Sequence, residues 1–302
     1  MDRQISEKRA YIMYIVSLLI VGTIGIVRRA IPLSSGLLAF VRGLLGALSL
    51  LLFVKLRGRR VGRGTDRKKR LLLVLTGVAL SFNWMLLFEA YTYTTVASAT
   101  LCYYYQPTLV LLLSPLLFKE KLTGKKLLSA AFAILGMILV SGVTEQRALP
   151  AGHLRGIACG LGAACLYAAV VILNKKIVGV DAYEKTIVEL LAAALTMLPY
   201  LLLTGELRAV RLDGSLLGLL LLIGIVYTGL VYALYFGSMD ALKAQTIAIL
   251  SYLDPVVALL TSALVLHESL SGRGVLGAVL ILGAALICEW QPRRETTQTG
   301  QR

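Results

Sequence analysis

The sequence has few acidic residues and lacks the patterns that carry common enzyme chemistry. Its 302 residues include 16 Asp and Glu against 31 Lys and Arg, and only 2 His. There is no HExxH, GxSxG or P-loop pattern, which are typical of zinc proteases, hydrolases and nucleotide-driven machines. We therefore predict a protein that is not an enzyme and that uses no cofactor.

Cysteine spacing is equally uninformative about metal or redox chemistry. The 4 cysteines all lie inside apolar runs, without CxxC or Cys/His ligand spacing. Neither a disulfide framework nor a zinc site is supported, and we expect packing roles and no metal. They are Cys102, Cys159, Cys165 and Cys288.

Long polar segments are also missing. Hydrophobic residues make up 58% of the chain and its mean hydropathy is +0.80, whereas about 45–50% apolar residues is usual in soluble domains. The net charge of +15 would suggest a nucleic-acid partner in a soluble protein. Here the basic residues occupy short connectors between apolar runs, so we expect contact with membrane lipid and no nucleic acid. The basic run from Arg57 to Arg70 then serves as a topology signal that can touch anionic lipid.

The second half of the chain repeats the first. Pro107 and Pro255 are separated by 148 residues, and so are Glu120 and Glu268, each of which follows its proline by 13 residues. A fixed offset near half the chain length indicates an internal duplication.

Ten apolar runs are long enough to cross a membrane, which takes about 20 residues of helix. Five helices per half is an odd number, so the second half enters the membrane from the opposite side, as in many secondary transporters. We predict an all-α membrane protein of ten transmembrane helices, built as two inverted repeats, residues 1–147 and 148–302. The runs are 10–27, 34–55, 71–91, 96–118, 126–143, 156–173, 185–203, 215–236, 244–266 and 274–290.

Basic residues are unevenly distributed between alternate connectors. With a cytoplasmic N-terminus, 23 Lys and Arg lie inside and 7 outside. By the positive-inside rule, we expect both termini in the cytoplasm and a multi-pass protein of the cytoplasmic membrane.

Four ionisable residues fall inside predicted helices, where each needs a partner or a wet cavity: Arg42, Glu89, Glu189 and Asp254. Arg42 and Glu189 are equivalent by the repeat and opposite in charge. They either neutralise each other or neighbouring carbonyls as a structural pair, or one of them faces the solute path.

Asp254 directly precedes Pro255, whose missing N–H frees a backbone carbonyl one turn earlier. The equivalent position before Pro107 is Gln106, so the pair is symmetric in fold but not in charge. Asp254 either contacts solute or accepts protons, or it bonds a neighbouring helix.

Aromatic residues gather near these positions. Three consecutive tyrosines lie further into the membrane than an aromatic belt at the interface would: Tyr103, Tyr104 and Tyr105. At most two of them can face one cavity, because neighbouring residues on a helix point about 100° apart. Such a wall beside a carboxylate suits an aromatic or cationic solute. Glu89 closes the third run, where it is either solvated at the interface or faces the solute.

The GxxxG pattern from Gly156 to Gly160 predicts close helix packing. Its partner is either the other repeat or a second copy in a homodimer.

These features together resemble the duplicated EamA domain of the drug/metabolite transporter superfamily. The resemblance covers the whole chain and implies ten helices, cytoplasmic termini and a central cavity lined mainly by helices 1, 3, 4, 6, 8 and 9. It implies export of amino acids or other metabolites, while some relatives move nucleotide sugars or choline-like cations. Gln106 departs from the family, where an acid often precedes the proline. The matching segments are 89–99, Gln106-Pro107, Lys119-Glu120-Lys121-Leu122-Thr123, Asp240-Ala241-Leu242, Leu253-Asp254-Pro255, His267-Glu268-Ser269-Leu270-Ser271 and Arg42.

We therefore predict a secondary active transporter that exports a small organic metabolite, such as an amino acid, by alternating access. The alternatives are an importer or exchanger of a cation such as choline, held by the tyrosines and Glu89, and a membrane scaffold or receptor without transport. We expect Glu120 and Glu268 to cap or orient loops. The predicted substrate-binding residues are Asp254, Tyr104, Gln106, Asn83, Trp84, Tyr103 and Glu89, with Arg42 and Glu189 as supporting charges and Pro107 and Pro255 as helix breaks.

Overall fold

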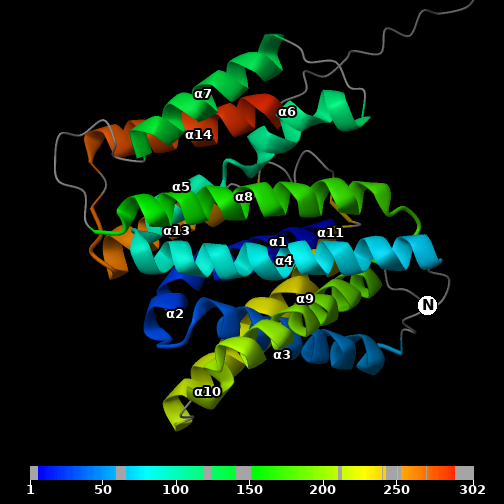
Figure 1. Ribbon diagram of the computed structural model, residues 1–302. Helices are drawn as coiled ribbons and strands as arrows, with labels where there is room; N and C mark the ends of the chain where they lie inside the picture. Colours follow the sequence, from blue (N-terminus) through cyan, green and yellow to red (C-terminus); the bar gives the residue numbers. More distant parts are fainter. Residues whose placement is uncertain are drawn as a thin grey trace, which may run out of the picture.

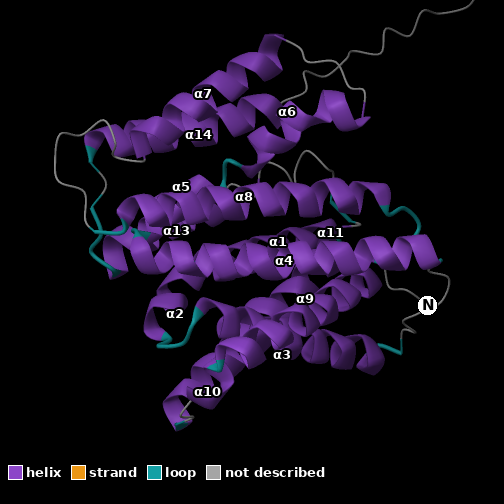
Figure 2. Ribbon diagram, in the orientation of Figure 1, coloured by secondary structure: helices purple, strands orange, loops and turns teal. Residues whose placement is uncertain are grey.

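The computed structural model describes residues 6–58, 66–118, 124–140, 151–209, 213–239, 241–242, 250, 253–269 and 271–289. Over these residues the protein is helical and contains no strand (Figure 2). The helices are α1 Glu7–Gly22, α2 Ile24–Ala30, α3 Ser35–Leu56, α4 Arg67–Tyr93, α5 Val96–Tyr103, α6 Gln106–Phe118, α7 Gly124–Val140, α8 His153–Lys176, α9 Ala182–Thr204, η1 Glu206–Ala209, α10 Gly214–Leu221, η2 Leu222–Leu230, α11 Val231–Met239, α13 Leu253–Val265 and α14 Gly272–Glu289.

Six of these helical segments are long and apolar enough to cross a membrane. They are Glu7–Ala30, Ser35–Leu56, Arg67–Tyr93, His153–Asn174, Ala182–Thr204 and Gly214–Ser238. Shorter apolar helices run over Leu127–Val140, Leu253–Val265 and Gly272–Ala284. The all-helical membrane prediction is confirmed, whereas the number of ten spans remains a prediction. Parts of three predicted runs lie outside the described residues, namely 141–143, 244–249 with 251–252, and 290. Residues 59–65 of the basic run and Glu120 also lie outside them.

The fourth predicted run, 96–118, is not one continuous helix. α5 ends at Tyr103, Tyr104 is its C-cap, and α6 begins at Gln106. Pro107 therefore lies in the first turn of α6, where a missing backbone N–H removes no intrahelical bond. The break places Tyr104 and Gln106 at helix ends, whose backbone polar groups must be satisfied locally.

The eighth predicted run contains a wider turn. Residues Leu222–Leu230 form a π-helix between α10 and α11. Within it, the Thr228 hydroxyl donates to the Ile223 carbonyl, five residues earlier, at 3.0 Å. Such insertions are rare and occur frequently at functional sites.

Helices from the two halves pack in reciprocal pairs. α3 packs against α9 and α7 against α14, and these partners occupy equivalent positions in the two halves. The contact of α4 with α8 is matched by that of α11 with α1, because each joins the third helix of one half to the first of the other. In Figure 1, α7 and α14 lie side by side at one edge of the molecule, away from α3 and α10.

Gly77 permits the close approach of α4 to α9. A Cβ atom added there would lie 2.5 Å from the Glu189 carbonyl oxygen and 2.5 Å from Ala192 Cβ. Neither atom belongs to a flexible side chain, so this contact sets the depth at which α9 presents Glu189.

We expect Gly77→Ala to lower the thermal unfolding midpoint of purified protein by at least about 2 °C, because overpacking costs about 1–3 kcal/mol. Gly218→Ala is the matched control, since a Cβ there meets nothing within 4 Å. A midpoint for Gly77→Ala equal to that of the control would contradict this packing.

Candidate functional site

A cavity of about 590 Å³ lies between the helices of both halves. This volume falls in the range of about 300–1,000 Å³ typical of small-molecule sites. Its walls come from α1, α3, α4, α5, α8, α9, α11 and α13, and from the break between α5 and α6. The lining reaches Asn174 and Thr186, which lie near the connection between α8 and α9.

Asp254 is held in this cavity by a tyrosine from the other half of the chain. The Tyr104 hydroxyl donates to Asp254 Oδ2 at 2.6 Å. Tyr104 reaches it from the break after α5, while Asp254 occupies the first turn of α13. The two proline-bearing segments therefore meet through one charge-assisted hydrogen bond, which is stronger than a neutral one.

Arg42 is buried in the cavity wall and contacts the π-helical segment. Its Nε donates to Thr228 Oγ1 at 3.1 Å, and its guanidinium carbon lies 4.3 Å from the centre of the Trp84 ring. Tyr232 also forms a side-chain hydrogen bond with Arg42. These contacts fix the cation on an aromatic face.

Glu189 lines the same cavity but forms no ion pair with Arg42 among the described residues. The Asn174 side chain of α8 lies beside its carboxyl group. Its Oε1 atom is buried without a hydrogen-bond partner. The structure thus gives the two charges separate partners, and their proposed mutual neutralisation is not found.

Seven of the predicted site residues line the cavity: Asp254, Tyr103, Tyr104, Gln106, Trp84, Arg42 and Glu189. Tyr105 is not among the lining residues, in line with the two-of-three expectation for the tyrosines. The Gln106 Oε1 atom is buried without a partner, like that of Glu189. Pro255 is buried in α13 outside the lining, and the side chain of Pro107 lies outside the described part.

Asn83 and Glu89 lie away from this cavity. The fully buried Asn83 donates from Nδ2 to the Ala163 carbonyl at 2.7 Å, which ties α4 to α8. Glu89 Oε2 accepts from Ser35 at 2.8 Å, and Glu89 Oε1 pairs with Arg155 at 3.2 Å. Asn83 and Glu89 share α4 with Trp84, but their side chains lie on other faces of the helix.

Several lining residues were not singled out from the sequence. Tyr232, Tyr235 and Phe236 share one face of α11 by their three- and four-residue spacing, and this spacing was the available signal. Tyr167 and Asn174 on α8 and Thr186 on α9 also line the cavity. Nothing in their local sequence distinguishes them from packing residues.

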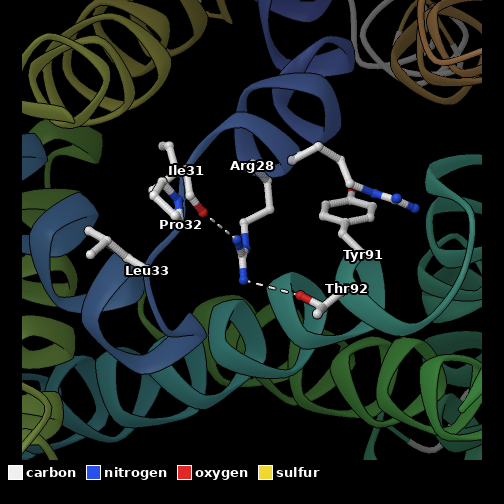
Figure 3. Close-up of a pocket in the computed structure, with 7 residues that line it drawn as sticks. Arg28, Ile31, Pro32, Leu33, Tyr91 and Thr92 are labelled. Atoms are coloured by element: carbon white, nitrogen blue, oxygen red, sulfur yellow. Dashed lines mark hydrogen bonds between the residues drawn. The ribbon is translucent and has the colours of Figure 1, made fainter. Parts of the chain in front are cut away.

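A polar network occupies the opposite end of the bundle from the connection between α8 and α9. There Arg28 donates to the Ile31 carbonyl at 3.0 Å and to Thr92 Oγ1 at 3.1 Å (Figure 3). It also donates to Ser35 Oγ at 3.3 Å. Arg28, Ile31 and Thr92 border a second pocket of about 300 Å³. Tyr91 lines both this pocket and the central cavity, so its ring separates them.

Glu268 joins this network across the two halves. Its Oε1 pairs with Arg29 at 2.8 Å, and its Oε2 accepts from the backbone N–H of Val96 at 2.8 Å and from Ser262 at 2.6 Å. Glu268 thus caps the start of α5 and orients its own loop, which confirms the predicted role.

The GxxxG segment packs within the chain. A Cβ atom on Gly156 would lie 2.8 Å from Thr94 Cβ, and one on Gly160 would lie 2.8 Å from Cys102 Cβ. This face of α8 therefore packs against α5 and against Thr94 at the end of α4, while a homodimer remains a prediction.

Both halves of the chain match one family model. Residues 8–142 and 154–289 each match the EamA-like transporter family. The chain belongs to the EamA-like transporter family. This EamA chain is 31% identical to the uncharacterized transporter YxxF of Bacillus subtilis, over 85% of this chain and 83% of the relative.

Two further relatives of the EamA chain carry a more specific name, probable amino-acid metabolite efflux pump. The Salmonella typhimurium protein is 30% identical over 72% of this chain and 75% of its own length, and the Escherichia coli protein is 30% identical over 70% and 74%. A crystal structure with 20% identity and a TM-score of 0.65 covers 94% of this chain and 96% of its own, so it shares the fold. The EamA chain is thus a multi-pass membrane protein that moves small solutes, and it is not an enzyme.

We expect Tyr104→Phe to lower the stability of the EamA chain by about 1–3 kcal/mol, because it leaves a buried carboxylate without its donor. Tyr105→Phe is the matched control, since Tyr105 does not line the cavity. The measurement is the thermal unfolding midpoint of each purified variant, and equal midpoints would contradict the importance of the Tyr104 bond.

Proposed function

We propose that this protein is a secondary active transporter that exports a small organic metabolite, an amino acid or a related solute, across the cytoplasmic membrane. The carrying observation is the cavity between the two halves, which combines a tyrosine-rich wall with three charged side chains. The names of the Salmonella and Escherichia coli relatives favour amino-acid-related solutes and efflux.

The proposed architecture is ten transmembrane helices in two inverted repeats, residues 1–147 and 148–302, with both termini in the cytoplasm. The reciprocal packing of helices between the halves supports it, because a two-fold relation generates contacts in matched pairs. The excess of basic residues on one set of connectors supports the orientation.

The position of the cavity, between Tyr91 and the connection of α8 with α9, supports the proposal of alternating access. In the described conformation, the cavity lining extends toward that connection, which the proposed topology places in the cytoplasm. The Arg29–Glu268 pair lies at the other end and joins the two halves. In this proposal that pair is part of the outer gate and separates when the cavity opens outward.

The first test is solute flux in proteoliposomes, with a panel of amino acids, their metabolites and choline. Flux of at least one amino acid or metabolite above that of empty vesicles is expected. Flux of choline alone would favour a transporter of cations, and no flux of any solute would favour the scaffold or receptor and overturn the proposal.

Asp254→Asn should reduce flux at least about tenfold, because hydrogen bonds to a charged group contribute about 1.5–3 kcal/mol. Asp181→Asn is the control: Asp181 caps α9 by accepting from the N–H groups of Tyr183 and Glu184, and Asn caps helices equally well. A rate for Asp254→Asn matching that of the control would remove Asp254 from the transport site.

Breaking the Arg29–Glu268 pair should make Tyr91, which lies between the second pocket and the central cavity, accessible from outside. The test compares two variants without native cysteines, Tyr91→Cys alone and Tyr91→Cys combined with Arg29→Gln. We expect the cysteine of the combined variant to react several-fold faster with a membrane-impermeant maleimide. Arg273→Gln serves as the control, because Arg273 lies on the same side in the proposed topology and does not border the second pocket. Equal labelling rates with and without Arg29→Gln would argue against a gate at this position.

A further inference from the structure

Three charged side chains line the described cavity, and two of them have their principal partners in the protein. Arg42 bonds with Thr228 and Tyr232 and stacks on Trp84. Asp254 accepts the Tyr104 hydroxyl at 2.6 Å, and it also lies within the electrostatic field of Arg42. Their opposite charges offset each other within the cavity.

Glu189, the third charged residue of the cavity, has an acceptor atom without a hydrogen-bond partner. Its Oε1 atom is buried and accepts no hydrogen bond, and Asn174 of α8 lies beside the carboxyl group. Lys185, one turn earlier on α9, is near enough to attract the Glu189 charge, but its amine donates to the Ile177 carbonyl at 2.5 Å and forms no ion pair with Glu189. A buried carboxylate with an open acceptor position is costly unless a cation or a donor completes it.

Aromatic side chains line the same cavity as Glu189. Tyr167 of α8 and Tyr232 of α11 both lie close enough to Glu189 for their hydroxyls to interact with its charge. Tyr235 and Phe236 continue the wall, with the ring centres of Tyr232 and Phe236 5.8 Å apart and those of Tyr235 and Phe236 5.2 Å apart. Ring faces and a carboxylate are the two groups that proteins use to hold a positively charged nitrogen.

We propose that Glu189 receives the positively charged nitrogen of the transported solute, with the carbon part of the solute against the tyrosines. This inference rests on the proposed transport function and narrows its substrate class. Both an amino acid and a simple amine carry such a nitrogen. They differ in the carboxylate, and the cation among the described lining residues is Arg42, which is already engaged.

The test uses four probes that share one phenyl ring and differ in charge: 2-phenylethylamine, phenylalanine, 3-phenylpropionate and 2-phenylethanol. A ligand that binds the folded protein raises its thermal midpoint. We expect 2-phenylethylamine at 10 mM to stabilise purified wild-type protein, and the anion and the alcohol to have no effect. Phenylalanine equal to the amine assigns amino acids as the solute class, and the amine alone assigns simple amines. No stabilisation by 2-phenylethylamine overturns the proposal.

Glu189→Gln should raise the Kd for 2-phenylethylamine at least about tenfold. Glu184→Gln, five residues earlier on the same helix and also buried, does not line the cavity and should leave this Kd unchanged. An unchanged Kd in Glu189→Gln, or equal losses in both variants, overturns the assignment.

Carbodiimide labelling of wild-type protein keeps the test independent of whether Glu189→Gln folds. The protecting probe is N,N-dimethyl-2-phenylethylamine, because a tertiary amine cannot couple to the activated carboxyl as a primary amine would. We expect this amine, and not 2-phenylethanol, to slow the modification of Glu189 as followed by mass spectrometry. Labelling that the amine does not slow overturns the proposal. These binding measurements need no flux, so failure here with flux intact removes only the role of Glu189, whereas absent flux removes the transport function itself.

Discussion

A polar group in the apolar part of this protein is costly unless it finds a partner inside the protein, because lipid offers none. This constraint explains why the irregular backbone at Tyr104 and the π-helical turn at Thr228 both lie beside the central cavity. The Tyr104 hydroxyl donates a hydrogen bond to Asp254, and the Thr228 hydroxyl accepts one from Arg42. In each case the departure from regular helix brings a hydroxyl to a charge that regular packing would leave alone.

The same constraint separates residues that hold the bundle from residues that face the cavity. Asn83 and Glu89 are polar and lie on the same helix as Trp84, yet their bonds go to Ala163, Ser35 and Arg155. Asp254 and Glu189 face the cavity, where one is satisfied by the protein and the other is not. The chemical type of a buried residue thus predicts that it needs a partner, but it does not predict where that partner lies.

Sequence reasoning reached the helical membrane fold and the internal repeat because both depend on long apolar runs and a constant offset. It also identified Asp254, Tyr104 and Arg42, since a charge or a tyrosine beside a proline is conspicuous in an apolar run. It missed the π-helical turn, because the sequence of Leu222–Leu230 is that of an ordinary apolar helix. The wider turn is recognised only from the structure, where Thr228 accepts a hydrogen bond from Arg42. It misplaced Asn83 and Glu89, because their orientation depends on the rotation of α4 against α8 and α3.

The π-helical turn also makes the cavity wall sensitive to chain length. A π-turn holds one residue more than an α-turn, and each residue of an α-helix advances about 100° around its axis. Removing one residue between Leu222 and Leu230 would therefore rotate the following helix by about that angle and carry Tyr232, Tyr235 and Phe236 off the cavity together. Within this fold, a one-residue deletion can exchange an entire aromatic face, so solute preference can change without any substitution at the wall itself.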